Sequence, residues 1–194
     1  MRRLIHVPII HSLADLGSAS GQLEEQFKTS GASRSWEQHL REVEQRWDVI
    51  RHKLLALPLD YARVKLYQDG LPECGAELKI VRALANSGSQ NCRLLLELHL
   101  KGAQIIGSED VELLVEEYNR IRRRLAQSQL LAEAPGQTPT ADSFYDELVA
   151  RRDAYIAKRI ESSLGAGETG ILFLGAAHRI LDLLANDIVV TSLL

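Results

Sequence analysis

The sequence predicts a single three-layer α/β domain, built on a mainly parallel sheet of about five strands with helices on both faces. Two observations predict this fold. Short apolar runs alternate along the chain with longer segments whose apolar residues recur every three or four positions. The runs at 171–174 and 188–190 are apolar throughout, as is typical of strands covered on both faces. Strands that alternate with helices in this way form parallel sheets.

The first 106 residues contain three of the expected strands. An apolar run at 4–10 predicts the first strand, and 22–28 is a possible short helix. Ser35 is a plausible N-cap of a helix that Pro58 ends. The apolar stripe of this helix predicts a core or dimer-facing surface and comprises Trp36, Leu40, Val43, Trp47, Ile50, Leu54 and Leu57. The remaining elements expected here are a strand at 63–66, helices at 74–85 and 92–100, and a strand at 104–106.

The second half contains two long helices and two strands. Glu109 or Asp110 opens the first helix, whose apolar stripe comprises Val111, Leu114, Tyr118, Ile121 and Leu125. Residues 135–140 predict a long surface loop within one domain that spans 1–194. Asp142 or Ser143 can cap the next helix, which runs to about Leu164 and leads through a glycine-rich turn into the last two strands.

Composition narrows the classes of function. The formal net charge of −3 lacks the basic surplus of nucleic-acid-binding proteins. No run approaches the roughly 18 apolar residues of a membrane span, and the N-terminal apolar stretch predicts a strand instead of a signal peptide. The only cysteines, Cys74 and Cys92, show neither CxxC spacing nor a disulfide-dense pattern. We therefore expect a cytoplasmic protein that binds neither nucleic acid nor membranes.

Polar residues follow four of the apolar runs. His11, Asp69, Glu109 and His178 each lie within four residues after the end of a predicted strand. The carboxyl ends of parallel strands share one edge of a sheet, where ligands bind. His11, His178 and Asp69 are therefore the candidate metal ligands, and zinc or manganese suits this donor set.

Each candidate also has a structural interpretation. A histidine at a strand end can be a hydrogen-bonded structural residue, and Asp69 belongs to a good turn sequence. For Glu109, a helix-start role that suits the helix dipole is at least as well supported. The histidines at 6, 39, 52 and 99 are interpreted as surface or packing residues.

Arg152 falls on a stripe that is otherwise apolar. Leu148, Ile156, Ile160 and Leu164 recur at four-residue steps on the same helix, whereas Arg151 and Asp153 lie off the stripe and are expected to be solvated. An unpaired buried charge is very costly. We therefore expect Arg152 either to pair with a structural carboxylate or to face an anionic ligand or a developing negative charge.

Three common enzyme motifs are missing or out of context. The chain has no Walker-type phosphate loop and no GxSxG nucleophile elbow. The fragment at 165–170 matches GxGxxG, but it precedes a strand and lacks the following helix that dinucleotide binding requires.

The order of these residues resembles the TraB/TIKI, ChaN and erythromycin-esterase-like superfamily. Gly175-Ala176-Ala177-His178 matches the second GxxH motif of that superfamily, and Arg152-Asp153 resembles its arginine helix. His11 matches the histidine of the first motif, but the glycine is replaced by Pro8, and Gln68-Asp69 stands where a glutamate is expected. The resemblance implies metal-dependent hydrolysis, with Asp69 as a possible replacement for the missing glutamate.

The leading hypothesis is a metal-assisted hydrolase of a small-molecule or peptide substrate. His11 and His178 would bind the ion, Asp69 would bind it or act as general base, and Arg152 would stabilise the oxyanion. The alternative is a non-catalytic module that binds a small anionic ligand or a partner protein through the same cleft. A third hypothesis is a homo-oligomer that associates through the stripe between Trp36 and Leu57.

Overall fold

The protein contains a five-stranded, all-parallel sheet, which confirms the predicted α/β class. The computed structural model describes residues 1–9, 35–131 and 143–194. The strands lie in the order β3-β2-β4-β1-β5. Their bounds are β1 (Arg2–Ile9), β2 (Val64–Gln68), β3 (Gln104–Ile106), β4 (Thr169–Gly175) and β5 (Ile188–Ser192).

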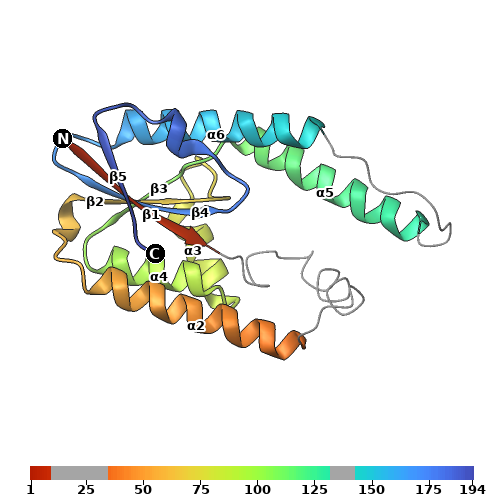
Figure 1. Ribbon diagram of the computed structural model, residues 1–194, viewed down its shortest axis with the longest axis horizontal. Coiled ribbons are helices and arrows are strands. Elements are labelled where there is room, and N and C mark those ends of the chain that lie inside the picture. The colour runs from red at the N-terminus through yellow and green to blue at the C-terminus, as the bar shows by residue number, and fades with distance from the viewer. Residues whose placement is uncertain (10–34, 132–142) are drawn as a thin grey trace.

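Helices cover both faces of the sheet, as predicted (Figure 1). One face is covered by α2 (Trp36–Leu55), α3 (Glu77–Asn86) and α4 (Gln90–Leu100). The other is covered by α6 (Ser143–Ser163) and the short 3₁₀ helix η3 (Ile180–Leu183), with α5 (Val111–Leu131) packed against α6. A further 3₁₀ turn, η2 (Tyr61–Arg63), leads into β2. The possible helix at 22–28 and the predicted loop at 135–140 lie outside the described residues.

Side chains of β2 alternate between the two layers, and this alternation positions the site. Val64 and Leu66 belong to the core beneath α2, α3 and α4, whereas Tyr67 belongs to the core beneath α6. Because the period of a strand is two residues, Gln68 faces the α4 layer and the next residue, Asp69, faces the α6 layer. One residue of register therefore decides which polar side chain meets α6.

The long stripe of α2 packs into the core. Ser35 caps this helix, and a reciprocal hydrogen bond with Gln38 completes a capping box. The central stripe residues Val43, Trp47, Ile50 and Leu54 are buried against the sheet. Of the two alternatives for this stripe, core packing is the one that the structure shows for these four residues, whereas Trp36, Leu40 and Leu57 are partly buried. The helix ends at Leu55, three residues before Pro58.

The stripe of α5 behaves differently, because most of it faces solvent. Asp110 caps the helix by accepting hydrogen bonds from the backbone amides of Glu112 and Leu113. Leu113 is buried, whereas Val111 and Tyr118 are exposed. Helix α5 lies beside α6 and reaches beyond the sheet (Figure 1), so its stripe has no sheet to cover.

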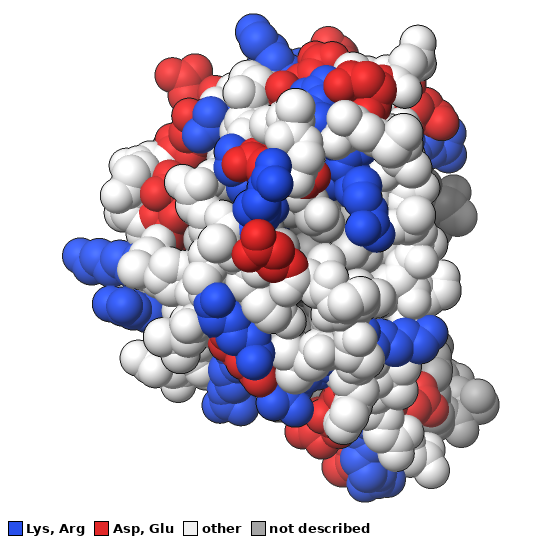
Figure 2. Space-filling model, turned by 90° about the vertical axis from the view of Figure 1, so that its left-hand side faces the viewer, with Lys and Arg blue, Asp and Glu red and all other residues white. Residues whose placement is uncertain are grey.

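The edge of the sheet at which the strands begin carries charges of both signs. Figure 2 shows this side of the molecule, with Lys and Arg atoms interspersed among Asp and Glu atoms. Arg2 pairs with Asp187 at 2.6 Å, and Lys65 pairs with Glu168 at 2.8 Å. In the part of the chain that the structure describes, no helix is both long and apolar enough to cross a membrane.

The loops after β2 and β3 run side by side and extend the sheet beyond its regular strands. Pro72 forms a bridge with Glu109, and the carbonyl of Leu71 accepts hydrogen bonds from the amides of Ser108 and Glu109. Gly107 allows this close approach, because a Cβ atom there would lie 2.6 Å from both the Cα of Glu73 and the carbonyl oxygen of Pro72.

We expect Gly107→Ala to destabilise the protein by about 1–3 kcal/mol, because the added methyl group meets rigid backbone on the neighbouring loop. Urea unfolding measures this change. Gly165→Ala is the control, since the nearest atom to its added Cβ is the flexible carboxylate of Glu168 at 3.0 Å. Equal losses for the two variants would contradict the predicted close packing of the loops.

Candidate functional site

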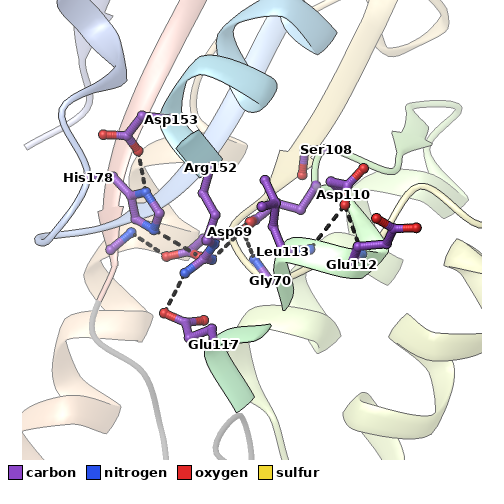
Figure 3. Close-up of polar contacts among 12 residues, drawn as sticks. Asp69, Gly70, Ser108, Asp110, Glu112, Leu113, Glu117, Arg152, Asp153 and His178 are labelled. Carbon is purple, nitrogen blue, oxygen red and sulfur yellow. Dashed lines mark hydrogen bonds and ion pairs between the residues drawn. The ribbon is translucent and has the colours of Figure 1, made fainter. Parts of the chain in front are cut away.

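Four polar side chains from distant parts of the sequence meet at the C-terminal edge of the sheet (Figure 3). Asp69 follows β2, Glu109 follows β3, His178 follows β4, and Arg152 reaches them from α6. The structure thus brings together three of the predicted site residues, namely Asp69, Arg152 and His178. The fourth, His11, lies outside the described residues.

Arg152 is buried and pairs with three carboxylates. Its Nε and Nη2 donate to the two oxygens of Glu109, both at 2.6 Å. Its Nη2 also donates to Asp69 Oδ1 at 3.1 Å, and Nη1 donates to Glu117 at 2.6 Å. Burial opposes the charge of the guanidinium, but Glu109, Glu117 and Asp69 together raise the pKa of Arg152. Of the two alternatives for this arginine, carboxylate pairing is therefore the one that the structure shows.

Glu109 is a site residue that the sequence argument favoured as a helix start. Asp110 caps α5 instead, and Glu109 is fully buried. Besides Arg152, its carboxylate accepts a hydrogen bond of 2.6 Å from the amide of Gly70, whose positive φ of 79° suits glycine. Burial raises the pKa of Glu109 although Arg152 favours its ionised form. The sequence did contain a signal for this role. Two consecutive acids, Glu109 and Asp110, follow the strand, and only one of them is needed to cap the helix.

Asp69 is held rigidly at the end of β2. Its amide donates to the carbonyl of Phe173 on β4, and its Oδ2 accepts a 3.0 Å hydrogen bond from the amide of Gly175. Gly175 is the first residue of the Gly-Ala-Ala-His segment that leads to His178. The backbone of that segment therefore orients the carboxylate of Asp69.

The imidazole of His178 lies between two carboxylates (Figure 3). Its Nδ1 is 2.5 Å from Asp153 Oδ1, and its Nε2 is 3.3 Å from Asp69 Oδ1. Burial alone would lower the pKa of His178, but Asp69 and Asp153 outweigh it and raise the pKa to about 9. The side chain is therefore protonated at neutral pH in the form that the structure describes.

Asp153 corrects one expectation from the sequence. The residue was expected to be solvated because it lies off the apolar stripe of α6, but it is only 4% exposed. The segment after β4 folds back over α6 and covers it, and the amide of Arg179 donates to its Oδ2 at 2.8 Å. Arg151, in contrast, is exposed and pairs with Glu116, as expected for a solvated residue.

Gln68 points away from this cluster into the α4 layer. Its Nε2 donates to the carbonyl of Asp69, and its Oε1 accepts from Asn91 Nδ2. These two bonds fix the orientation of both amides and leave Asn91 Oδ1 buried without a hydrogen-bond partner among the described residues. The side chain of Asp69 therefore lies on the α6 side of β2, whereas the side chain of Gln68 lies on the α4 side.

His6, His52 and His99 make no contact with this cluster among the hydrogen bonds and ion pairs of the described residues. His6 lies within β1, where burial lowers its pKa. His52 on α2 contacts the carbonyl of Asp48, and His99 on α4 contacts that of Ala103. Their surroundings match the surface and packing roles expected from the sequence.

The arrangement suits a cation better than an anion. Asp69, Glu109 and His178 each offer a ligand atom, and these atoms lie within 4.8 Å of one another. Four carboxylates, those of Asp69, Glu109, Glu117 and Asp153, face only two basic side chains. Acidic side chains therefore outnumber basic ones in a partly dehydrated region, which favours a positively charged ligand.

The raised pKa of His178 predicts that stability falls as the pH rises from about 6.5 to about 9. In this range the unfolded imidazole loses its proton whereas the folded one keeps it, so the ion pairs stop favouring the folded state. The loss reaches at most about 3 kcal/mol. Urea unfolding at several pH values checks this expectation. His178→Gln should flatten the decrease, and the exposed control His52→Gln should retain it; equal slopes in both variants would contradict the assignment.

We expect Gln68→Glu to destabilise the protein at pH 7 by about 1–3 kcal/mol or more, because an ionised glutamate cannot donate to the carbonyl of Asp69. Protonated glutamate can donate that hydrogen bond, so the difference from wild type should shrink towards pH 4. Chemical unfolding of both proteins at each pH measures the difference. Glu97→Gln, which breaks an exposed pair with Arg51, is the control for a change between these residue types. A neutral or stabilising effect at pH 7 would contradict the hydrogen-bond assignment.

Comparisons with protein-family models, with curated proteins and with solved structures give no match to this chain. The site is therefore interpreted from its own geometry and charge.

Proposed function

We propose that this protein is a metal-assisted hydrolase that acts on a small-molecule or peptide substrate at the C-terminal edge of its sheet. The observation that carries the proposal is the convergence of ligand atoms from Asp69, Glu109 and His178 within 4.8 Å. Two carboxylates and an imidazole form a donor set that suits zinc or manganese.

The surroundings of His178 support a ligand role. Its Nδ1 contacts Asp153, which leaves Nε2 on the side of Asp69. Histidines that bind metals usually donate their other ring N–H to a carboxylate or carbonyl, which fixes the tautomer and the ring orientation. Asp153 would play that part here, so His178 would bind through Nε2 after losing its second proton.

His11 remains a further proposed ligand. It follows β1 by two residues, and β1 lies next to β4 with Ile9 paired to Gly175. His178 comes three residues after that same Gly175. The order of the strands is therefore compatible with two histidines from neighbouring strand ends.

The remaining roles follow from the hydrogen bonds. A bound divalent ion supplies a hydroxide nucleophile near neutral pH and polarises the scissile bond. Asp69 is oriented by the amide of Gly175 either to bind the ion or to accept a proton from the attacking water. Arg152 would hold Asp69 and Glu109 in place as a positioning residue, because its nitrogens donate to these carboxylates.

The alternative is a non-catalytic module that binds a small anionic ligand or a partner protein. An anionic ligand would need free donors on Arg152, but four of its five N–H groups already donate to carboxylates. The surplus of carboxylates also repels an anion. These two observations favour the metal-assisted hydrolase over anion binding.

The likeness to the TraB/TIKI, ChaN and erythromycin-esterase-like superfamily belongs to the same proposal. Its support is that Gly175 and His178 of the Gly-Ala-Ala-His segment both contact Asp69, and that Arg152 contacts Asp69 as well. On this interpretation Asp69 takes the position of the missing glutamate, while Gln68 has a packing role.

Metal titration of chelator-treated protein tests the proposal. Calorimetry with zinc and with manganese salts should detect binding to the wild type, and Glu109→Gln should weaken it by at least about tenfold. Glu116→Gln on the same helix is the control, because Glu116 is exposed and pairs only with Arg151 among the described residues. A panel of chromogenic esters, amides and phosphate esters with each metal would then reveal the reaction.

A second variant guards against a folding defect in Glu109→Gln. Asp153→Asn keeps the proposed ligands and should still lower metal affinity by about 10- to 100-fold, because Asp153 orients His178. Circular dichroism verifies that each variant is folded. If the wild type binds neither metal, or if the variants bind as tightly as the control, the proposal is wrong.

A further inference from the structure

The hydroxyl of Ser108 joins the two strand ends that carry Asp69 and Glu109. Ser108 directly precedes Glu109 and is fully buried. Its Oγ donates to the carbonyl of Gln68 at 2.5 Å and accepts a hydrogen bond from the amide of the same residue at 3.2 Å. Gln68 in turn directly precedes Asp69. A single side chain therefore contacts the backbone beside one carboxylate and is the chain neighbour of the other.

This contact lies beyond the regular pairing of the two strands, which ends at Tyr67 of β2 and Ile106 of β3. The amide of Ser108 donates to the carbonyl of Leu71, and it is the hydroxyl that reaches the carbonyl of Gln68. A serine hydroxyl can donate one hydrogen bond while it accepts another, as this position requires. The side chain of Ser108 thus continues the contact between the two strands past the end of the sheet.

The peptide group between Gln68 and Asp69 is held from both neighbouring strands. Its N–H donates to the carbonyl of Phe173 on β4 at 2.9 Å, and its carbonyl accepts from Ser108 on the β3 side. The direction of the Asp69 side chain follows from the orientation of this peptide, because the two are joined at the same Cα atom. Without the hydroxyl, the carbonyl loses a donor in a buried region, which favours rotation of the peptide towards another donor.

The position of the Asp69 carboxylate relative to that of Glu109 matters for the site that they share. Their ligand atoms and that of His178 lie within 4.8 Å of one another. Arg152 donates to both carboxylates, but it reaches them on a long side chain from α6. Ser108 connects the two strand ends over a much shorter path. A binding site needs its ligands held to within about 0.5 Å, which short buried contacts of this kind provide.

We propose that Ser108 is a positioning residue whose hydroxyl sets the separation between the carboxylates of Asp69 and Glu109. It acts on Asp69 through the peptide of Gln68 and on Glu109 through its own peptide. The effect on metal affinity rests on the proposed function, whereas the positioning of the two carboxylates requires no metal.

Nuclear magnetic resonance of the metal-free protein tests the positioning. The amide of Gly175 donates to Asp69 at 3.0 Å and that of Gly70 donates to Glu109 at 2.6 Å, so these two amide signals report on the two carboxylates. Ser108→Ala should move at least one of the two amide protons upfield, because a changed separation lengthens at least one of these hydrogen bonds. The lengthened bond should also protect its amide less from hydrogen exchange.

Ser163→Ala is the matched control. It also removes a hydroxyl with two contacts, to the phenol of Tyr67 and to the carbonyl of Arg159, but at the last residue of α6. This variant should leave both glycine signals in place. If Ser108→Ala moves neither signal farther than this control does, the proposal is wrong.

Ser108→Cys separates hydrogen bonding from packing in the same metal-free experiment. A thiol fills the space of the hydroxyl but donates and accepts only weakly. The glycine signals should therefore move in the same direction as in Ser108→Ala. Signals at their wild-type positions would mean that packing and not the hydrogen bond is responsible, which would overturn the proposal.

Calorimetry with zinc and with manganese salts measures the consequence for the proposed metal site. Ser108→Ala should weaken metal binding by about tenfold or more, and Ser163→Ala should change it by less than about twofold. Urea unfolding of both variants separates this effect from stability. A loss of stability in Ser108→Ala with unchanged metal affinity would mean a purely structural role and would overturn the proposal.

The positioning proposal and the metal-assisted hydrolase can fail separately. If the wild type binds neither metal but both Ser108 variants move the glycine signals, the metal-assisted hydrolase is wrong and Ser108 still positions the two carboxylates. If the wild type binds metal and both Ser108 variants leave the glycine signals in place, the positioning proposal is wrong and the metal site stands.

Discussion

The ion pairs of Arg152 are the interaction on which the rest of the site depends. A guanidinium on the buried face of α6 is tolerable only if its charge and its donors are satisfied. Glu109, Asp69 and Glu117 satisfy them from three separate parts of the chain, namely the segments after β3 and β2 and the helix α5. Arg152 thereby fixes α6 and α5 against the end of the sheet. Its pairing also brings two carboxylates to the same place, which like-charge repulsion would otherwise oppose.

The same pairing supports the proposal of a metal ligand over an anionic one. Because four of the five N–H groups of Arg152 donate to carboxylates, its positive charge is paired within the protein. His178 contributes a second positive charge, but Asp153 and Asp69 contact its two ring nitrogens. The carboxylates that remain in excess make the cluster attractive to a cation. Of the two alternatives that the sequence left open for Arg152, a structural carboxylate or an anionic ligand, the structure shows the first.

The sequence predicted the fold class, the positions of the strands to within about two residues, and the proximity of Asp69, Arg152 and His178. Those predictions rest on local rules, which are strand and helix periodicity, the shared edge of parallel strand ends and the cost of an unpaired charge. It favoured a helix-start role for Glu109 and missed the burial of Asp153. Nothing local distinguishes Glu109 from Asp110 as the cap of α5, and Asp153 is buried by a segment that follows it by some 25 residues. The two helical stripes also looked alike, yet that of α2 is core and that of α5 is exposed.

By itself, the sequence determined which strand residues alternate between the two faces of the sheet, which residues share one face of a helix, and which follow the end of a strand. These properties depend only on neighbours within a few positions of the chain. Only the tertiary structure decided that Asp69 and not Gln68 faces Arg152, that Glu109 joins the cluster, and that the apolar face of α5 meets solvent. Each of these outcomes depends on strand order, on the face of the sheet and on which distant element covers a side chain. Burial and charge pairing are set by residues far apart in sequence, so no local pattern contains them.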